Sequence, residues 1–224
     1  PLRVTVDRRV SVVIPVKNGA AGLRACIDGI LEQTVEPFEV IVIDSGSTDG
    51  SVEVAKRYSR VTLLEIPSDE FNHGGTRNFG VAASAGEFVL LTVQDARPAT
   101  RSWIADMLSG VTDARVAGVC GIQVVPHERN KNPVDWYRPI SSASVERYEF
   151  SDPSDFERLT PAEKRRICGW DDVTALYRRS ALVELPFRET SYGEDTLWAR
   201  DAILSGWALV HTSFAKVFHY HHQT

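Results

Sequence analysis

Short runs of β-branched and other apolar residues alternate with segments of helical periodicity in the first hundred residues, and this alternation constrains the fold most. Runs of this kind without clean polar alternation are typical of strands that a parallel sheet buries on both faces. Four runs are expected to be strands: 10–16, 38–43, 61–66 and 87–93. Three intervening segments have helical spacing or follow capping residues: 22–33, 51–58 and 72–84. This order predicts a doubly wound α/β sheet with right-handed crossovers.

The second half of the chain is less regular. Its polar, proline-containing stretch 126–166 has little periodicity, and we interpret it as an insertion or a mobile segment on the acceptor side. Two helices are expected, at 103–111 and 194–204. Three extended segments are expected, at 116–125, 173–177 and 207–220. A chain of 224 residues fits one large domain with such an elaboration.

Composition excludes several classes of protein. The chain is 43% hydrophobic and 25% charged, as in ordinary globular proteins. A formal net charge of −5 argues against a general nucleic-acid binder. Three widely spaced cysteines predict neither a disulfide framework nor a cysteine zinc site. No apolar run approaches the ~18 residues that span a bilayer, and no signal peptide is present.

Polar side chains follow three of the predicted strands. Lys17 follows the first, Asp44 and Ser45 follow the second, and Gln94 and Asp95 follow the fourth. Open α/β sheets bind ligands beyond the carboxyl ends of their strands, so these polar residues at strand ends predict a binding site at one rim of the sheet. Neither GxGxxG after the first strand nor GxxxxGK[ST] anywhere is present. Dinucleotide oxidoreductases and P-loop NTPases are therefore disfavoured.

Two long stretches carry a family resemblance. The stretch SVVIPVKNGAAGLRACIDGILEQTVEPFEVIVIDSGSTDGS resembles the opening of family 2 glycosyltransferases, which have the GT-A fold. FNHGGTRNFGVAASAGEFVLLTVQDARP is most similar to the rhamnosyltransferase-like branch, and the resemblance resumes at SYGEDTLWARDAILSGWALV and FAKVFHYHH. It implies one GT-A catalytic domain over 1–224, with a Rossmann-like nucleotide-sugar half at about 10–98 and an acceptor-binding half at 99–224.

The resemblance implies a donor site in the first half. Its residues match Pro15, Lys17, Asp44, Ser45 and Gln94. A carboxylate suits the N3–H of uracil or thymine because a charged acceptor makes the stronger hydrogen bond. Many relatives have two adjacent acids in this turn, whereas here the second position is serine, so which residue reads the base stays open. A simple turn cap is the alternative role of Asp44.

His73 and Arg77 stand four residues apart on a predicted helix and therefore share a face. Gly74 and Gly75 between them permit a close backbone approach at the helix start. A helix N-terminus with an arginine and a histidine on one side suits a diphosphate, a role that the resemblance supports. A solvated arginine and a capping histidine are the alternative.

Asp95 is the metal candidate that the resemblance implies. The family pattern Asp-x-Asp here reads Val-Gln-Asp, so the protein supplies fewer oxygens. One carboxylate with phosphate and water is sufficient for Mg²⁺ or Mn²⁺. His219 and His221 match a family histidine segment, and an imidazole ligand favours Mn²⁺. The alternatives are a metal-independent enzyme and a frayed or tag-derived histidine end.

Glu194 and Asp195 follow a glycine at the start of a predicted helix. Charge complementarity with the helix dipole explains acids in this position without any catalytic role. The resemblance implies instead that Asp195 is the general base of an inverting transfer, with Glu194 as the second choice. Acceptor contacts are implied at Trp170, Asp171 and Asp172, with an exposed tryptophan as a platform for a sugar face.

For any single tryptophan a core position is the alternative, and Trp136 and Tyr137 are further acceptor candidates in the insertion. The resemblance implies transfer of a hexose, L-rhamnose from a dTDP donor being favoured over UDP-sugars, to a hydroxyl of a bacterial surface polysaccharide or lipid-linked glycan. A cytoplasmic location is expected, with peripheral attachment at the inner face of the plasma membrane left open. The alternatives are a non-catalytic nucleotide-sugar-binding module and, more weakly, a nucleotidyltransferase.

Overall fold

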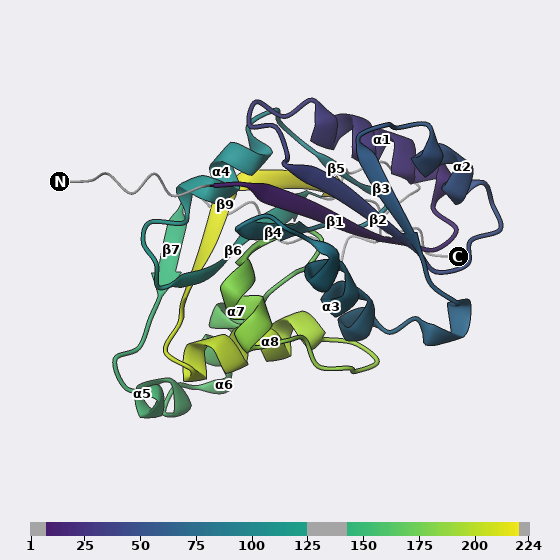
Figure 1. Ribbon diagram of the computed structural model, residues 1–224. Coiled ribbons are helices and arrows are strands. Elements are labelled where there is room, and N and C mark those ends of the chain that lie inside the picture. Colours follow the sequence, from purple (N-terminus) through teal and green to yellow (C-terminus); the bar gives the residue numbers. More distant parts are fainter. Residues whose placement is uncertain (1–7, 125–142, 220–224) are drawn as a thin grey trace, which may run out of the picture.

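A computed structural model describes residues 8–124 and 143–219 (Figure 1). Within these ranges one nine-stranded sheet has the order β3-β2-β1-β4-β8-β6-β9-β5, and β7 pairs with β9 outside that path. The strands are β1 (Val10–Val16), β2 (Glu39–Asp44), β3 (Val61–Glu65), β4 (Phe88–Leu91), β5 (Ala96–Pro98), β6 (Val116–Val124), β7 (Val145–Tyr148), β8 (Ala175–Arg178) and β9 (Ala208–His219).

Helices cover both faces of the curled sheet (Figure 1). One face carries α1 (Ala20–Leu31), α2 (Ser51–Lys56) and α4 (Trp103–Ser109). The other face carries α3 (His73–Ala83), α5 (Pro153–Glu157), α6 (Pro161–Ile167), α7 (Arg179–Glu184) and α8 (Glu194–Leu204). A short 3-10 turn, η1 (Ser68–Glu70), precedes α3. The predicted α/β architecture is confirmed, with the sheet lying between two layers of helices.

The first four strands pair in parallel, as the alternation of strands and helices predicts. β1 lies between β2 and β4, and β3 extends the sheet beyond β2. Alternate residues of β1 enter opposite cores, with Val12 and Ile14 on the α1 side and Val13 on the α3 side. A strand with two buried faces has no polar alternation, which explains its continuous apolar run.

The second half completes the sheet with strands of both directions. β8 runs antiparallel to β4 and β6, β9 runs parallel to β6, and β5 and β7 run antiparallel to β9. Six strands, β1–β4, β6 and β9, therefore share one direction. The described part of the stretch interpreted as an insertion, 143–166, contains β7, α5 and most of α6, none of which its weak periodicity had indicated.

Candidate active site

A cavity of about 220 Å³ lies at the rim where β1 and β4 end. It is lined by Pro15, Val16, Lys17, Phe71, His73, Arg77, Val93, Gln94, Asp95 and His219. Seven of these were expected at the site from the sequence, although they come from both halves of the chain. The parallel strands deliver their carboxyl ends to one edge, and β9 returns to the same edge through its pairing with β5.

Gln94 and Lys17 fix the loops around this cavity rather than projecting freely into it. The Gln94 side chain accepts a hydrogen bond from the Lys17 backbone N–H at 2.8 Å and donates to the Lys17 carbonyl at 3.1 Å. An aspartate could not make the second bond, because a carboxylate only accepts. Lys17 Nζ in turn donates to the carbonyls of Ser45 and Gly46 at 2.7 and 2.9 Å. The amide in the Val-Gln-Asp motif therefore has a structural role.

Asp44 and Ser45 are buried and are not among the residues that line the cavity, and of the two only Asp44 has a side-chain oxygen unpaired within the described residues. Ser45 is fully buried, and its hydroxyl donates to the Val16 carbonyl at 2.8 Å. Asp44 is also buried, and its Oδ2 accepts from the Ser47 N–H at 2.9 Å. Its Oδ1 has no hydrogen-bond partner in the described part of the chain. A buried carboxylate oxygen is rarely left unpaired, so Asp44 is the position equipped to accept from a ligand.

Asp95 and His219 form the candidate metal pair. His219 Nε2 lies 3.3 Å from Asp95 Oδ1, and His219 Nδ1 lies 2.8 Å from Gln123 Oε1. The Gln123 amide nitrogen donates to the Asp171 carboxylate, which fixes the amide orientation. Nδ1 therefore donates to Gln123 Oε1, and in a neutral imidazole this places the lone pair on Nε2, facing Asp95. Two electron-rich atoms at this distance suit a shared cation.

This donor set fits a divalent ion, since Mn²⁺ accepts both imidazole nitrogen and carboxylate oxygen. Within 8–124 and 143–219 no cluster of three or more histidine, cysteine or acidic side chains accompanies the pair. His221, the second predicted histidine ligand, lies outside the described residues. The remaining ligands would come from a diphosphate and water.

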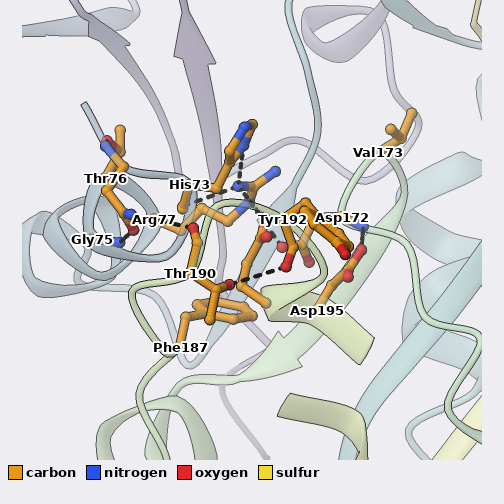
Figure 2. A network of polar contacts seen from close by, with 12 residues as sticks. His73, Gly75, Thr76, Arg77, Asp172, Val173, Phe187, Thr190, Tyr192 and Asp195 are labelled. Carbon is orange, nitrogen blue, oxygen red and sulfur yellow. Dashed lines mark hydrogen bonds and ion pairs between the residues drawn. The ribbon is translucent and has the colours of Figure 1, made fainter. Parts of the chain in front are cut away.

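Arg77 is held by carboxylates from the other half of the chain (Figure 2). Its Nε lies 2.8 Å from Asp172 Oδ2, and its Nη1 lies 2.7 Å from Glu194 Oε1. Tyr177 donates its hydroxyl to the other oxygen of Asp172. Burial lowers the pKa of Arg77, but Asp172 and Glu194 more than offset this, so the net shift is upward. The network joins α3, which carries Arg77, to α8, which carries Glu194.

Three expectations change because of this network. Arg77 is 7% exposed and already pairs with two carboxylates, so it is not a vacant diphosphate ligand. Glu194 is 4% exposed and paired, which removes it as an alternative base. Asp172 is 2% exposed, and burial raises its pKa against the opposing effect of Arg77; it is a network member rather than an acceptor contact. Partners about a hundred residues away in sequence determine all three roles.

Gly74, in the first turn of α3, permits a close approach different from the one expected at a ligand site. A Cβ on Gly74 would lie 2.1 Å from the Arg188 carbonyl oxygen, so the close approach there is to the protein's own backbone. The first turn is capped by Asn72, whose side chain accepts from the Gly75 N–H at 3.0 Å. His73 remains exposed at the cavity, with its ring 5.0 Å from that of Phe71.

Asp195 is the partly exposed acid of the network's edge (Figure 2). Gly193 precedes α8 with φ of 76°, a left-handed conformation that glycine adopts without strain. One Asp195 oxygen accepts from the Thr196 N–H at 2.7 Å and the other from the Asp172 N–H at 3.4 Å. Burial raises the pKa of Asp195, and the Glu194 and Asp171 carboxylates raise it further. A partly exposed carboxylate with a raised pKa is suited to accept a proton.

Trp170 is 3% exposed, so the expectation of an exposed stacking platform is wrong. Its Nε1–H donates to Tyr177 Oη at 2.7 Å, and its ring packs against Trp198 and His211. Asp171 is partly exposed and contacts Gln123 and the Val173 N–H. The acceptor candidates Trp136 and Tyr137 lie outside the described residues.

Sequence reasoning missed Phe71, Gln123 and Tyr177. Phe71 stands just before the FNHGGTRN histidine and lines the cavity, so the motif itself contained that signal. Gln123 and Tyr177 become visible only when β6 and β8 are placed in the sheet. A series of side-chain contacts runs from Asp95 through His219 and Gln123 to Asp171. Because the Asp171 carboxylate also raises the pKa of Asp195, the predicted metal ligand and the predicted base lie in one region.

Residues 11–185 match the family model described as glycosyl transferase family 2. The chain is 32% identical over 221 residues to the O-antigen chain rhamnosyltransferase RfbN of Salmonella typhimurium, covering 96% of this chain and 68% of that protein. It is 31% identical over 218 residues to the O-antigen chain rhamnosyltransferase WbaN of Salmonella anatum, covering 96% and 67%.

Two solved structures share the GT-A fold. The mannosyltransferase PcManGT from Pyrobaculum calidifontis, in complex with GDP-Man and Mn²⁺, superposes with a TM-score of 0.71 at 22% identity, covering 96% of this chain and 57% of that one. TarS 1–349 of S. aureus, in complex with UDP-GlcNAc, gives 0.73 at 18% identity, with coverage of 96% and 59%. The chain thus spans less than two thirds of these structures.

No helix in the described ranges has the length and apolar character needed to cross a bilayer. The family model covers most of the chain, and its match includes β1–β4 almost entirely and every described residue that lines the rim cavity except His219. The alignments with the two relatives cover 96% of this chain, so they continue beyond residue 185 and through α8, which supplies the candidate base. The chain belongs to glycosyl transferase family 2 and carries a GT-A glycosyltransferase domain of that family.

Proposed function

We propose that this domain is an inverting hexosyltransferase that moves a sugar from a nucleotide-diphosphate donor to a hydroxyl of a surface polysaccharide or lipid-linked glycan. The observation that carries the proposal is the meeting of the rim cavity, the Asp95–His219 pair and the partly exposed Asp195 in one region. L-rhamnose from a dTDP donor is favoured, supported by the two O-antigen chain rhamnosyltransferases. A UDP-sugar donor is the alternative.

In this proposal Asp44 accepts a hydrogen bond from the N3–H of the base through its unpaired Oδ1. His73 and the end of β1 line the path of the diphosphate, and Asp95 and His219 would hold the divalent ion, with Mn²⁺ favoured by the imidazole. When bound, that ion neutralises charge on the leaving diphosphate. The donor nucleotide thus spans the rim from β2 to β9.

Asp195 takes the proton of the acceptor hydroxyl as that oxygen attacks the anomeric carbon. A single base is sufficient for inversion, because the leaving diphosphate requires no protonation by a second acid. A sugar hydroxyl is a much weaker acid than a carboxyl group, so the proton moves late, when the oxygen is already bonding. We place the enzyme in the cytoplasm, at or near the inner face of the plasma membrane, where a lipid-linked acceptor would be reached.

A donor panel tests the proposed function directly. The chain is incubated with dTDP-L-rhamnose, UDP-glucose, UDP-galactose and UDP-N-acetylglucosamine, each with Mn²⁺ or Mg²⁺, and nucleotide diphosphate is measured. We expect slow, metal-stimulated release from one donor, with dTDP-L-rhamnose fastest. Saturable binding without release supports a non-catalytic module instead. Pyrophosphate release from a sugar phosphate and a nucleoside triphosphate would indicate a nucleotidyltransferase.

The metal assignment predicts that Asp95→Asn and His219→Ala each weaken Mn²⁺ binding by at least about tenfold, because each removes one of two protein ligands. Electron paramagnetic resonance of free Mn²⁺, with and without the donor diphosphate, measures this without relying on turnover. Asp69→Asn, at an exposed carboxylate in η1, is the matched control. Unchanged Mn²⁺ affinity in both ligand variants would contradict the assignment.

A further inference from the structure

A second cavity, of about 240 Å³, lies away from the donor rim, beside β7, β9 and the C-terminal part of α6. Its polar lining includes Ser144, Glu146, Tyr148, Arg166, His211 and Thr212. None of these residues takes part in the proposed donor, metal or base roles. Its volume is of the size that one six-membered sugar ring requires.

An irregularity in β9 opens this cavity. Cys120 of β6 pairs with His211 of β9, and the next pair is Ile122 with Lys216. Between these two pairs β6 advances by two residues and β9 by five, so three additional residues of β9 leave the ladder. β7 pairs with β9 over Leu209–Thr212 and closes one side of the opening. Bulges of this kind are retained features that often redirect side chains at binding sites.

Glu146 organises the polar side of the cavity. Its Oε2 accepts a hydrogen bond from the Tyr148 hydroxyl and another from Arg166 Nη2 at 2.8 Å. Its Oε1 has no hydrogen-bond partner in the described segments, and the side chain is 38% exposed. The Tyr148 ring is held edge-on to His211, with 5.6 Å between ring centroids. The site therefore has a fixed aromatic ring beside a carboxylate oxygen and several hydroxyl groups.

These features match a neutral sugar better than an anion. Vicinal hydroxyls donate to carboxylate oxygens, and the C–H face of a pyranose packs on an aromatic ring. Among the described residues of its lining, Arg166 already pairs with Glu146 through Nη2, so a phosphate would compete with that carboxylate for the guanidinium. A nucleotide or a phosphorylated lipid would meet the Glu146 carboxylate instead.

The cavity is also close to the transfer site along β6. Ile122 lines it, and the next residue, Gln123, contacts both His219 and Asp171. His211, on the cavity wall, packs on Trp170, which hydrogen-bonds to Tyr177 of the Arg77 network.

We propose that this cavity binds one monosaccharide unit of the acceptor glycan, distant from the hydroxyl that is attacked. The proposal rests on the glycosyltransferase function proposed above. It makes Glu146 and Tyr148 acceptor-recognition residues, and it predicts that the enzyme recognises an acceptor longer than a single sugar.

The test titrates ¹⁵N-labelled full chain with methyl α-L-rhamnopyranoside, methyl α-D-galactopyranoside and methyl α-D-mannopyranoside. We expect saturable amide shifts at residues 144–148 and 211–213 with at least one glycoside. Glu146→Gln is expected to weaken that binding about tenfold, because the charge-assisted bond to a sugar hydroxyl is lost. Glu149→Gln is the matched control: Glu149 follows β7 and pairs with Arg147 on the other face of the strand.

Saturable shifts that Glu146→Gln weakens and Glu149→Gln leaves unchanged support the sugar site. No saturable shift at these amides with any glycoside, or equal affinity of the two variants, overturns it. Ser144→Phe, which fills the cavity, provides a second check if Glu146→Gln folds poorly, and undiminished binding in that variant also overturns the site. Diphosphate release by the wild-type chain distinguishes the two proposals: release without sugar shifts contradicts only the cavity, and sugar shifts without release contradict only the transferase.

Discussion

Asp195→Asn is expected to lower sugar transfer by about 10²–10⁴-fold, the range that a positioned general base contributes, while donor affinity stays nearly unchanged. The substitution keeps the shape of the side chain, and its one remaining oxygen keeps the 2.7 Å bond from the Thr196 N–H, whereas the longer 3.4 Å bond from the Asp172 N–H is lost. It removes the carboxylate charge that accepts the proton. Asp195 does not line the donor cavity, so nucleotide binding has no reason to fall.

Transfer is measured with an acceptor glycan under saturating donor, and donor affinity is measured by calorimetry. Asp201→Asn is the control, because Asp201 lies on the same helix and pairs with Arg188 at 2.7 Å. Transfer by the Asp195 variant at the wild-type rate would remove Asp195 from the mechanism.

The same assignment determines the sign of the pH dependence. Burial raises the pKa of Asp195 above the ordinary aspartate value of 3.8, and a base acts only when ionised. Transfer is therefore expected to decline as the pH falls through this raised pKa, at a higher pH than an ordinary aspartate would give. The residual activity of Asp195→Asn should lack that acidic limb, which separates a lost base from a general loss of structure.

Local sequence signals predicted the parts of the fold that local chemistry determines. The predicted helix 194–204 coincides with α8, because glycine, two acids and an apolar stripe mark its start and its buried face. The first three β-branched runs became β1–β3 within a residue or two. Both faces of β1 and β2 are buried, whereas β3 is an edge strand with Thr62 and Glu65 exposed. β7 was missed because its sequence, VERY, alternates within a polar region and pairs only with the distant β9.

The site divides in the same way. The polar residues at strand ends were predictable, because a parallel sheet gathers them whatever the rest of the chain does. The roles of Arg77, Glu194 and Trp170 were not, because each depends on burial beside residues far away in sequence. Arg77 and His73 do share a helix face, yet the helix turns the arginine toward the acceptor half. Sequence spacing identifies which residues are neighbours on one helix, but it does not identify which other part of the chain packs against them.

The second large effect expected is on stability: Arg77→Met should lower the free energy of unfolding by about 3–5 kcal/mol, because removing one partner leaves buried charges uncompensated. Asp172 and Glu194 are both nearly inaccessible, and each carboxylate pairs with this guanidinium. Urea unfolding followed by circular dichroism measures the change. Arg188→Met is the control, since its pair with Asp201 is partly exposed (53% and 23%), far more than the Arg77 pairs, and exposed pairs contribute about 0–1 kcal/mol.

A triple variant separates the charge effect from a simple loss of packing. Adding Asp172→Asn and Glu194→Gln to Arg77→Met removes the two uncompensated carboxylates while preserving side-chain shape and the hydrogen bond from Tyr177. The triple variant should therefore regain a substantial part of the lost stability, as neutralised buried ion-pair sites do. A triple variant no more stable than Arg77→Met would mean that the methylene packing of Arg77, rather than its charge, joins α3 to α8. If the charge of Arg77 holds α3 against α8, its removal also loosens the donor half of the chain from the acceptor half.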